Sequence, residues 1–276
     1  MFKDLPPILN ERYRLGKPLG QGGVGSVFLS VDEQRGTEVA IKVLHPILGE
    51  REDLRKRFVR EGQAMMRFDH PNLCRVVEVG QEGTWIYMVM ERMYGTTHQL
   101  AVKSGGVGAV RALQIGIDVL DGLTAVHQKG WVHRDIKPAN LLIDLDGNIK
   151  ISDFGILRNT ASNLTRTGAV MGTVSYMPPE QRRDSREVDA RADLYALGAS
   201  LFAISSGKVP PDLSLVHLQP HLMDVVPNVL RAFIRRSTAF NADDRFPSAQ
   251  QMARVASEIL DVLGVEQGSM AQTIQG

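Results

Sequence analysis

The sequence predicts an α+β protein of two lobes, a small β-rich lobe followed by a larger helical one. Three observations predict this fold. Short runs rich in Val, Ile and Phe, broken by glycine or polar residues, fill residues 13–93. Beyond Gly95, apolar residues recur at helical spacing instead. The chain of 276 residues is 43% hydrophobic and 23% charged, a composition typical of folded globular proteins.

The small lobe is predicted to contain four strands and one helix. The strands are residues 24–31, 38–44, 76–81 and 85–90. Residues 51–68 form the helix, because apolar side chains recur there at roughly helical spacing at Leu54, Phe58, Met65 and Phe68. His70-Pro71-Asn72 follows and ends the helix, since proline cannot continue it.

The larger lobe is predicted to be mainly helical. Its helices are residues 110–128, 193–206, 228–239 and 249–263, of which the second is apolar on all sides and therefore buried. The predicted organisation is an N-terminal extension at residues 1–12, a small lobe at 13–93, a large lobe at 94–264 and a tail or linker start at 265–276.

Charge and cysteine content exclude several classes of protein. Lys and Arg number 32 against 31 Asp and Glu, a net charge of +1 that does not call for nucleic acid as a partner. The single cysteine, Cys74, cannot form an internal disulfide, and its apolar neighbours favour a buried thiol over a reactive or metal-binding one. The longest apolar stretch, residues 194–204, is shorter than the ~20 residues that span a bilayer. With no secretory signal pattern in residues 1–10, we expect a cytoplasmic location.

A glycine-rich hairpin, Gly20-Gln21-Gly22-Gly23-Val24-Gly25-Ser26-Val27, lies between two strand-like runs. Its backbone N–H groups can approach phosphate oxygens because no Cβ obstructs them. By itself such a run is equally typical of a plain turn. A strand follows it, which excludes a dinucleotide fingerprint, and no Gly-Lys-Ser/Thr closes it, which excludes a P-loop.

Lys42 lies within the apolar strand Val39-Ala40-Ile41-Lys42. A buried lysine needs an anion beside it, and either nucleotide phosphates or the carboxylate of Glu61 on the following helix would serve. The alternative is that Lys42 reaches solvent from an edge strand.

The segment His133-Arg134-Asp135-Ile136-Lys137-Pro138-Ala139-Asn140 places a carboxylate, an ammonium group and an amide in one short loop. Asp153-Phe154-Gly155 follows after two strand-like runs. Each motif is weak alone, but their joint occurrence in this order is highly specific.

With these motifs, residues 13–263 resemble the protein kinase family, and the chain looks most like the bacterial serine/threonine kinases related to the eukaryotic ones. Asp153 to Ile156 and Gly172-Thr173 to Glu180-Gln181 are typical of that group. The resemblance implies a bilobal protein-kinase fold. It also implies an enzyme that transfers the γ-phosphoryl group of MgATP to Ser or Thr hydroxyls of protein substrates.

The resemblance assigns the catalytic roles. Asp135 orients or accepts the proton of the attacking hydroxyl, and Lys137 neutralises the transferring phosphoryl group, which favours Ser/Thr over Tyr as acceptor. Asn140 and Asp153 bind Mg²⁺, for which Mn²⁺ can substitute. Lys42 holds the α- and β-phosphates with Glu61 as its partner.

The resemblance also assigns the nucleotide contacts. Adenine lies between Val27 and Ala40 on one side and Leu142 on the other, and it bonds the backbone of the segment around Met90. The full set is Leu19, Gly20, Gln21, Gly22, Gly23, Val24, Gly25, Val27, Ala40, Lys42, Met90, Glu91, Met93, Leu142 and Asp153.

Three further expectations concern control and support. Residues 158–170 correspond to an activation segment in which Thr165 and Thr167 are autophosphorylated and a phosphate pairs with Arg134. Glu180 pairs with Arg245, and Asp193 braces the catalytic loop. These last three residues are structural.

The chain departs from the family pattern at Thr97, about where an acidic residue often contacts the ribose, and at Pro178, where alanine is common. Residues 208–227 are also shorter than usual. Two alternatives stay open, a pseudokinase without turnover and a small-molecule kinase. Relatives also suggest a homodimer through the small lobe, and a chain that is the cytoplasmic domain of a longer membrane protein.

Overall fold

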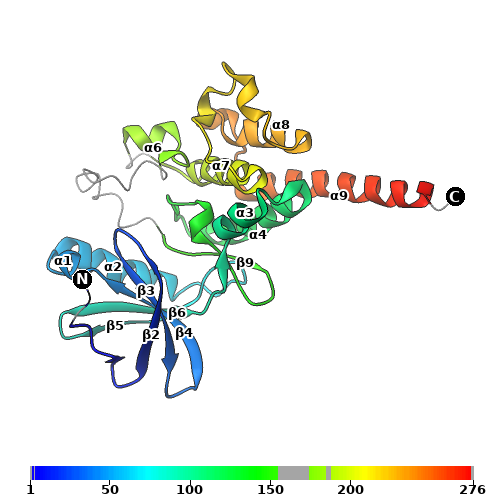
Figure 1. The fold of residues 1–276 in the computed structure, drawn as a ribbon. Coiled ribbons are helices and arrows are strands. Elements are labelled where there is room, and N and C mark those ends of the chain that lie inside the picture. Colours follow the sequence, from blue (N-terminus) through cyan, green and yellow to red (C-terminus); the bar gives the residue numbers. More distant parts are fainter. Residues whose placement is uncertain (1, 3, 155–173, 185–187, 275–276) are drawn as a thin grey trace. The chain divides into compact units, whose positions relative to one another are not determined.

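The computed structural model describes residues 2, 4–154, 174–184 and 188–274 of the chain. These residues divide into two compact units, one ending at Tyr94 and the other beginning at Gly95. The first unit is built on a six-stranded sheet and the second mainly on helices (Figure 1). This is the mixed α+β organisation that the sequence predicts.

The sheet of the N-terminal unit is antiparallel throughout, in the order β1-β2-β3-β4-β6-β5. Its strands are β1 (Ile8–Leu9), β2 (Tyr13–Gln21), β3 (Gly25–Asp32), β4 (Thr37–Leu44), β5 (Val76–Glu82) and β6 (Trp85–Glu91). All four strands predicted from their apolar runs are confirmed, each within one residue at either end. Strands β1 and β2 were not among these four. Strand β2 was indicated only as a strand-like run before the glycine-rich hairpin, and the two residues of β1 are too few to form a recognisable pattern.

One face of this sheet forms a hydrophobic core. Successive strand residues point to opposite faces, so Val39, Ile41 and Val43 of β4 share a face. They pack with Leu9, Tyr13, Tyr87 and Val89. Ala40 and Lys42 therefore point to the other face.

Helix α2 (Glu52–Met65) packs against strand β5 and confirms the predicted helix. Its buried side includes Leu54, Phe58 and Glu61. Gly62 permits the close approach, since a Cβ at this position would collide with the side chains of Val79 and Met88. Met88 is the direct partner of Lys42 in the neighbouring strand. Because paired residues share a face, α2 covers the face that carries Lys42. A single turn, α1 (Pro46–Gly49), precedes α2.

Helices α4 (Gly108–Gln128) and α7 (Arg191–Ser206) form the centre of the C-terminal unit. Helix α4 packs against α7 and α9 (Ala249–Ile274), and α7 packs against α3 (Thr97–Ser104) and α8 (Asn228–Ser237). Every residue of α7 from Ala192 to Ser205 is buried, as predicted from its apolar character. A short helix, α6 (Pro179–Arg183), precedes α7 in the sequence.

A small three-stranded sheet, in the order β7-β8-β9, carries the loops that matter for function. Its strands are β7 (Gly95–Thr96), β8 (Leu141–Ile143) and β9 (Ile149–Ile151). The 3₁₀ helices of the unit are η1 (Pro138–Asn140), η3 (Leu213–Leu215), η4 (Pro220–Met223) and η5 (Ala242–Asp244).

Helix α9 continues to Ile274, so the predicted helix end at Leu263 is wrong. The physical reason is that one glycine, Gly264, costs a helix only about 1 kcal/mol, and no proline follows to stop it. Within the residues that the structure describes, no helix combines the length and the apolar character needed to cross a membrane.

Candidate active site

His133 is fully buried at the start of the loop that carries the predicted catalytic residues. Its Nδ1 accepts a hydrogen bond from the Asp135 N–H at 3.2 Å, so Nε2 carries the proton donated to the Ser152 carbonyl oxygen at 3.0 Å. Burial lowers the pKa of His133, because a charged imidazolium would lose its hydration. A neutral ring therefore links the loop to the residue that precedes Asp153.

The carboxylate of Asp193, at the start of α7, accepts hydrogen bonds from two consecutive backbone N–H groups of this loop. Oδ2 accepts from His133 at 2.8 Å and Oδ1 from Arg134 at 2.7 Å. Oδ2 also lies 2.8 Å from Nε2 of His127 on α4. The side chain of Asp193 is fully buried, so these bonds hold the loop against the helical core.

Asp135, Lys137 and Asn140 converge within the loop. The Lys137 ammonium lies 2.9 Å from Asp135 Oδ2, and the Asn140 Nδ2 donates to the same oxygen at 2.9 Å. Nδ2 of Asn140 also donates to the Asp135 carbonyl oxygen at 2.8 Å. The result is a carboxylate with a fixed orientation and an adjacent cation, which suits it to accept a proton from a hydroxyl near an anionic group.

The amide orientation of Asn140 fits a divalent cation. Because Nδ2 donates both of those bonds, Oδ1 is the atom that Asn140 offers to a cation. Asn140 is also held by the residue that follows strand β9, since its carbonyl oxygen accepts from the Ser152 N–H at 2.9 Å. Asp153 follows with a left-handed φ of 57°. One carboxylate and one amide oxygen suit Mg²⁺, which commonly takes one or two protein ligands and completes its shell with water and phosphate oxygens.

Among the described residues, no three His, Cys, Asp or Glu side chains gather as a metal site. Asn140 and Asp153 together supply only one such side chain, so they do not form a cluster of this kind.

In the N-terminal unit, the strand register places four predicted nucleotide-binding residues on one face of the sheet. Val27 of β3 is paired with Lys42 of β4, and Ala40 of β4 with Met90 of β6. Ala40 and Lys42 are two residues apart, so all four side chains share the face opposite to the hydrophobic core. Ala40 and Met90 are buried there, and Lys42 is half-buried.

The glycine-rich hairpin joins β2 to β3. The Gly22 N–H donates to the Gly25 carbonyl oxygen at 2.9 Å and closes its tip. Gln21, Gly22 and Gly23 are exposed, whereas Gly25 is buried against β4. A Cβ at Gly25 would collide with the backbone of Val43, so this glycine is required by packing as well as by any ligand.

The remaining predicted residues of this unit lie around the same sheet. Glu61 is buried on α2, which covers the face that carries Lys42. Leu19 and Gly20, at the end of β2, are exposed. Glu91 ends β6, and Met93 follows it; both are half-buried. The predicted adenine contact that does not belong to this unit is Leu142, which lies on β8 of the C-terminal unit.

Residues 13–263 match the family model of the protein kinase domain. The chain belongs to the protein kinase family. It is 36% identical over 268 residues to the serine/threonine-protein kinase PknB of Mycolicibacterium smegmatis, covering 90% of this chain and 43% of that protein. It is 34% identical over 258 residues to PrkC of Bacillus subtilis, covering 88% of this chain and 40% of that protein.

The kinase domain of Mycobacterium tuberculosis PknI has a similar structure. The TM-score is 0.72 at 26% identity, with 91% of this chain and 98% of that domain covered. The family and the fold predicted from the sequence are therefore confirmed. This kinase chain spans less than half the length of the curated relatives described above.

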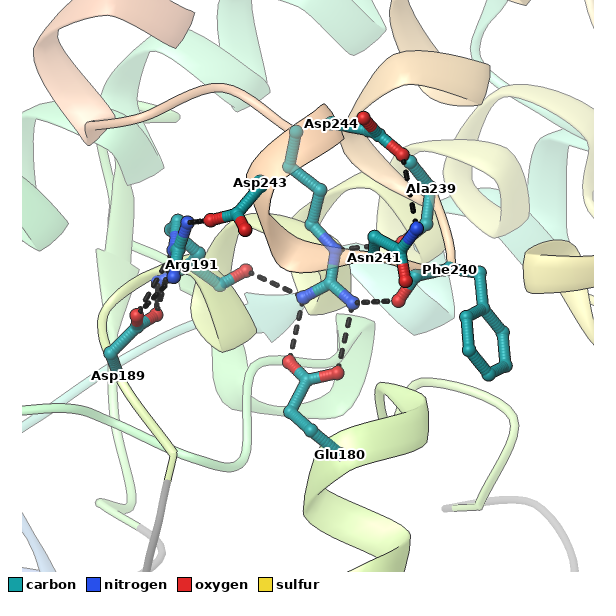
Figure 2. A network of polar contacts seen from close by, with 9 residues as sticks. Glu180, Asp189, Arg191, Ala239, Phe240, Asn241, Asp243 and Asp244 are labelled. Carbon is teal, nitrogen blue, oxygen red and sulfur yellow. Dashed lines mark hydrogen bonds and ion pairs between the residues drawn. The ribbon is translucent and has the colours of Figure 1, made fainter.

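The kinase's C-terminal unit contains an ion pair between Glu180 and Arg245 (Figure 2). Nη1 and Nη2 of Arg245 donate to the two carboxylate oxygens at 2.7 and 2.9 Å. The guanidinium is fully buried and also donates to three backbone carbonyl oxygens, those of Arg191, Ala239 and Phe240. Its five N–H donors are thus all used, so the pair joins α6 to the segment that follows α8.

The sequence reasoning did not identify three supporting residues of the kinase. The Thr97 hydroxyl is buried and donates to the Pro138 carbonyl oxygen at 2.9 Å, so this residue supports the catalytic loop from α3. Gln181 donates from Nε2 to the Arg134 carbonyl oxygen at 2.9 Å. Gly62 brings α2 onto the sheet. Of these three residues, only Gly62 could have been noticed in the sequence, because a glycine next to Glu61 inside a predicted helix indicates close packing.

The predicted phosphorylation sites Thr165 and Thr167 lie outside the described residues, as do Arg158, at the start of the predicted activation segment, and Thr173 of the motif typical of the group. Arg134, their predicted partner, is described. Its Nε is buried and has no hydrogen-bond partner in the described part of the chain.

Proposed function

We propose that this chain is an ATP-dependent serine/threonine protein kinase that transfers the γ-phosphoryl group of MgATP to Ser or Thr hydroxyls of proteins. The observation that carries the proposal is the convergence of Lys137 and Asn140 on the carboxylate of Asp135. The names of the curated relatives support the same acceptor class.

The residues have distinct tasks in this transfer. Asp135 orients the acceptor hydroxyl and takes its proton as the oxygen attacks phosphorus. Lys137 neutralises the charge that gathers on the transferring group. Asn140 and Asp153 hold Mg²⁺, which when bound screens the phosphate charges and can be replaced by Mn²⁺. On the sheet of the N-terminal unit, the glycine-rich hairpin and Lys42 bind the phosphates, and Glu61 pairs with Lys42.

The apolar side chains around these groups bind the base. Val27, Ala40 and Leu142 contact the adenine ring, and the backbone of Glu91 and Met93 bonds its edge. Support for this assignment comes from the shared sheet face of Val27, Ala40 and Met90.

We further propose that autophosphorylation at Thr165 or Thr167 activates the kinase. The support is the buried Nε of Arg134, since a phosphate is the kind of anion that an arginine binds through several hydrogen bonds. Mass spectrometry after incubation with MgATP is expected to find phosphate on at least one of these threonines. A fully active sample with both threonines unmodified would contradict this regulation.

The cellular setting is also a proposal. A cytoplasmic kinase domain acting on protein substrates, within a longer membrane-anchored protein, agrees with the greater length of the curated relatives. Dimerisation through the N-terminal unit is a further expectation, and sedimentation of the chain at several concentrations tests it.

The decisive experiment compares wild type with Asp135→Asn, using radiolabelled ATP, Mg²⁺ and a generic basic protein. The substitution keeps the size of the side chain but removes its negative charge, so we expect phosphate transfer to fall by at least about 100-fold. Asp146→Asn, in an exposed turn of the same unit, is the matched control and should transfer at the wild-type rate. Equal labelling by wild type and Asp135→Asn would refute the role of Asp135. No transfer by wild type would favour a pseudokinase, and transfer only to small molecules would favour a small-molecule kinase.

A further inference from the structure

His45, directly after β4, makes two hydrogen bonds to the glycine-rich hairpin. Its backbone N–H donates to the Val24 carbonyl oxygen at 2.9 Å. Its side-chain Nε2 lies 3.0 Å from the Gly22 carbonyl oxygen. A carbonyl oxygen only accepts, so Nε2 carries a proton. Nδ1 is buried and has no hydrogen-bond partner among the described residues.

Phe2, in the N-terminal segment, packs against the imidazole ring of His45. The two ring centroids are 5.2 Å apart. Phe2 also stacks on Trp85 of β6 and meets Phe28 of β3 edge to face, each at 5.8 Å between centroids. Aromatic contacts of this kind restrict the orientation of the rings they join. The position of the His45 ring is therefore set by residues of the N-terminal segment and of two strands.

Two glycines, Gly22 and Gly23, lie at the tip of the hairpin. Gln21, Gly22 and Gly23 are exposed, and glycines lose more conformational freedom than other residues when they become ordered. A side chain that holds the Gly22 carbonyl in place before nucleotide binds removes part of that cost. The Gly22 carbonyl and the Gly23 N–H belong to one planar peptide unit, so fixing the carbonyl also fixes the direction of that N–H.

We propose that His45 is a positioning residue for the glycine-rich hairpin and that Phe2 holds His45 in place. The N–H of His45 Nε2 orients the hairpin backbone through Gly22, and removal of either residue loosens the hairpin and weakens nucleotide binding. The effect on affinity depends on the proposed ATP-binding function, whereas the effect on the hairpin does not.

The first measurement is hydrogen–deuterium exchange of residues 20–25 in the nucleotide-free full chain. We expect His45→Ala and Phe2→Ala to accelerate exchange of these amides about fivefold, the change that loss of one hydrogen bond produces. His45→Gln keeps an N–H donor at nearly the same reach and should restore slow exchange. In Phe2→Ala the hydrogen bond is intact but less restrained, so its effect should not exceed that of His45→Ala.

The second measurement separates positioning from general stability. The Kd for a fluorescent methylanthraniloyl-ADP and the KM for ATP should rise about fivefold in His45→Ala, with kcat within about twofold of wild type. Leu5→Ala is the matched control, because Leu5 is half-buried on the same core cluster as Phe2, whereas the hydrogen bonds and ring contact of His45 given above involve Gly22, Val24 and Phe2. Leu5→Ala should lower the Tm without changing hairpin exchange or nucleotide affinity.

Three results would overturn the proposal. They are unchanged hairpin exchange in His45→Ala, failure of His45→Gln to restore it, and equal acceleration by Leu5→Ala. If the wild-type chain bound no nucleotide, the proposed function would fail, and the exchange comparison would still decide whether His45 holds the hairpin.

Discussion

Asp193 Oδ1 accepts a 2.7 Å hydrogen bond from the backbone N–H of Arg134, a residue whose φ of 67° lies in the left-handed region. A non-glycine residue in this region costs of order 1–3 kcal/mol, so the surrounding contacts must hold it. The second bond of Asp193, to the His133 N–H, and the Gln181 bond to the Arg134 carbonyl supply such contacts.

Asp193→Asn is therefore expected to impair the catalytic loop. The amide can accept only one of the two N–H bonds, and its own NH₂ group would face a donor. Each lost charge-assisted bond costs roughly 1.5–3 kcal/mol. We expect the free energy of unfolding to fall by about 2–4 kcal/mol and kcat by at least about tenfold, with a smaller change in the KM for ATP. Urea titration and steady-state kinetics measure both, and wild-type kcat in this variant would show that the brace is dispensable.

Arg245→Lys tests the buried ion pair with Glu180. A lysine has three donors on one nitrogen and cannot replace five donors spread over a plane. Loss of these bonds in a fully buried site is expected to lower the free energy of unfolding by roughly 3 kcal/mol.

The matched control is Arg254→Lys. Arg254 also pairs with a glutamate, Glu258, but its side chain is 78% exposed. The change there should stay within about 0.5 kcal/mol by urea unfolding, because exposed pairs contribute little. Similar losses at both positions would mean that burial does not determine the contribution of Arg245.

Gly62→Ala tests the close packing of α2 on the sheet. A Cβ at this position collides with Val79 and Met88, so we expect a loss of roughly 1–3 kcal/mol in the free energy of unfolding. The KM for ATP should rise as well, because α2 also carries Glu61. Gly264→Ala, in helix α9 with open space around it, should instead stabilise the chain by about 0.5–1 kcal/mol. Differential scanning calorimetry of both variants distinguishes collision from helix propensity.

His133 gives the stability of the kinase a pH dependence. Its pKa in the folded state is lowered by burial from the ordinary value of 6.5, so the unfolded chain binds a proton more readily than the folded one. The contribution of neutral His133 is complete above pH 6.5 and is lost as the pH falls below it, with a slope of at most about 1.4 kcal/mol per pH unit.

Urea unfolding at several pH values between about 5 and 7 measures this slope, above the range where most carboxylates titrate. His133→Gln should be less stable at pH 7 but should show a smaller slope. Parallel stability curves for wild type and His133→Gln would contradict the assignment to this residue.

Much of the fold could be predicted from local patterns. Short runs rich in Val, Ile and Phe placed β3, β4, β5 and β6 within one residue of their ends, and the continuous apolar run correctly indicated that α7 is buried. The end of α9 was missed, because the glycine after the predicted end, Gly264, does not stop a helix that has no proline after it. Strand β1 was missed because a strand of two residues exists only through its pairing with β2.

The sequence by itself determined the family and the chemical groups of the site, because Asp135, Lys137, Asn140 and Asp153 occur at spacings that are specific when they appear together. Asp193 was predicted to brace the catalytic loop, but only the tertiary structure revealed the further contacts that hold these groups in place. Thr97 and Gln181 reach the catalytic loop from distant parts of the chain. Phe2 reaches His45 across 43 positions of sequence. Such contacts depend on how elements pack in three dimensions, and no local periodicity in the chain encodes them.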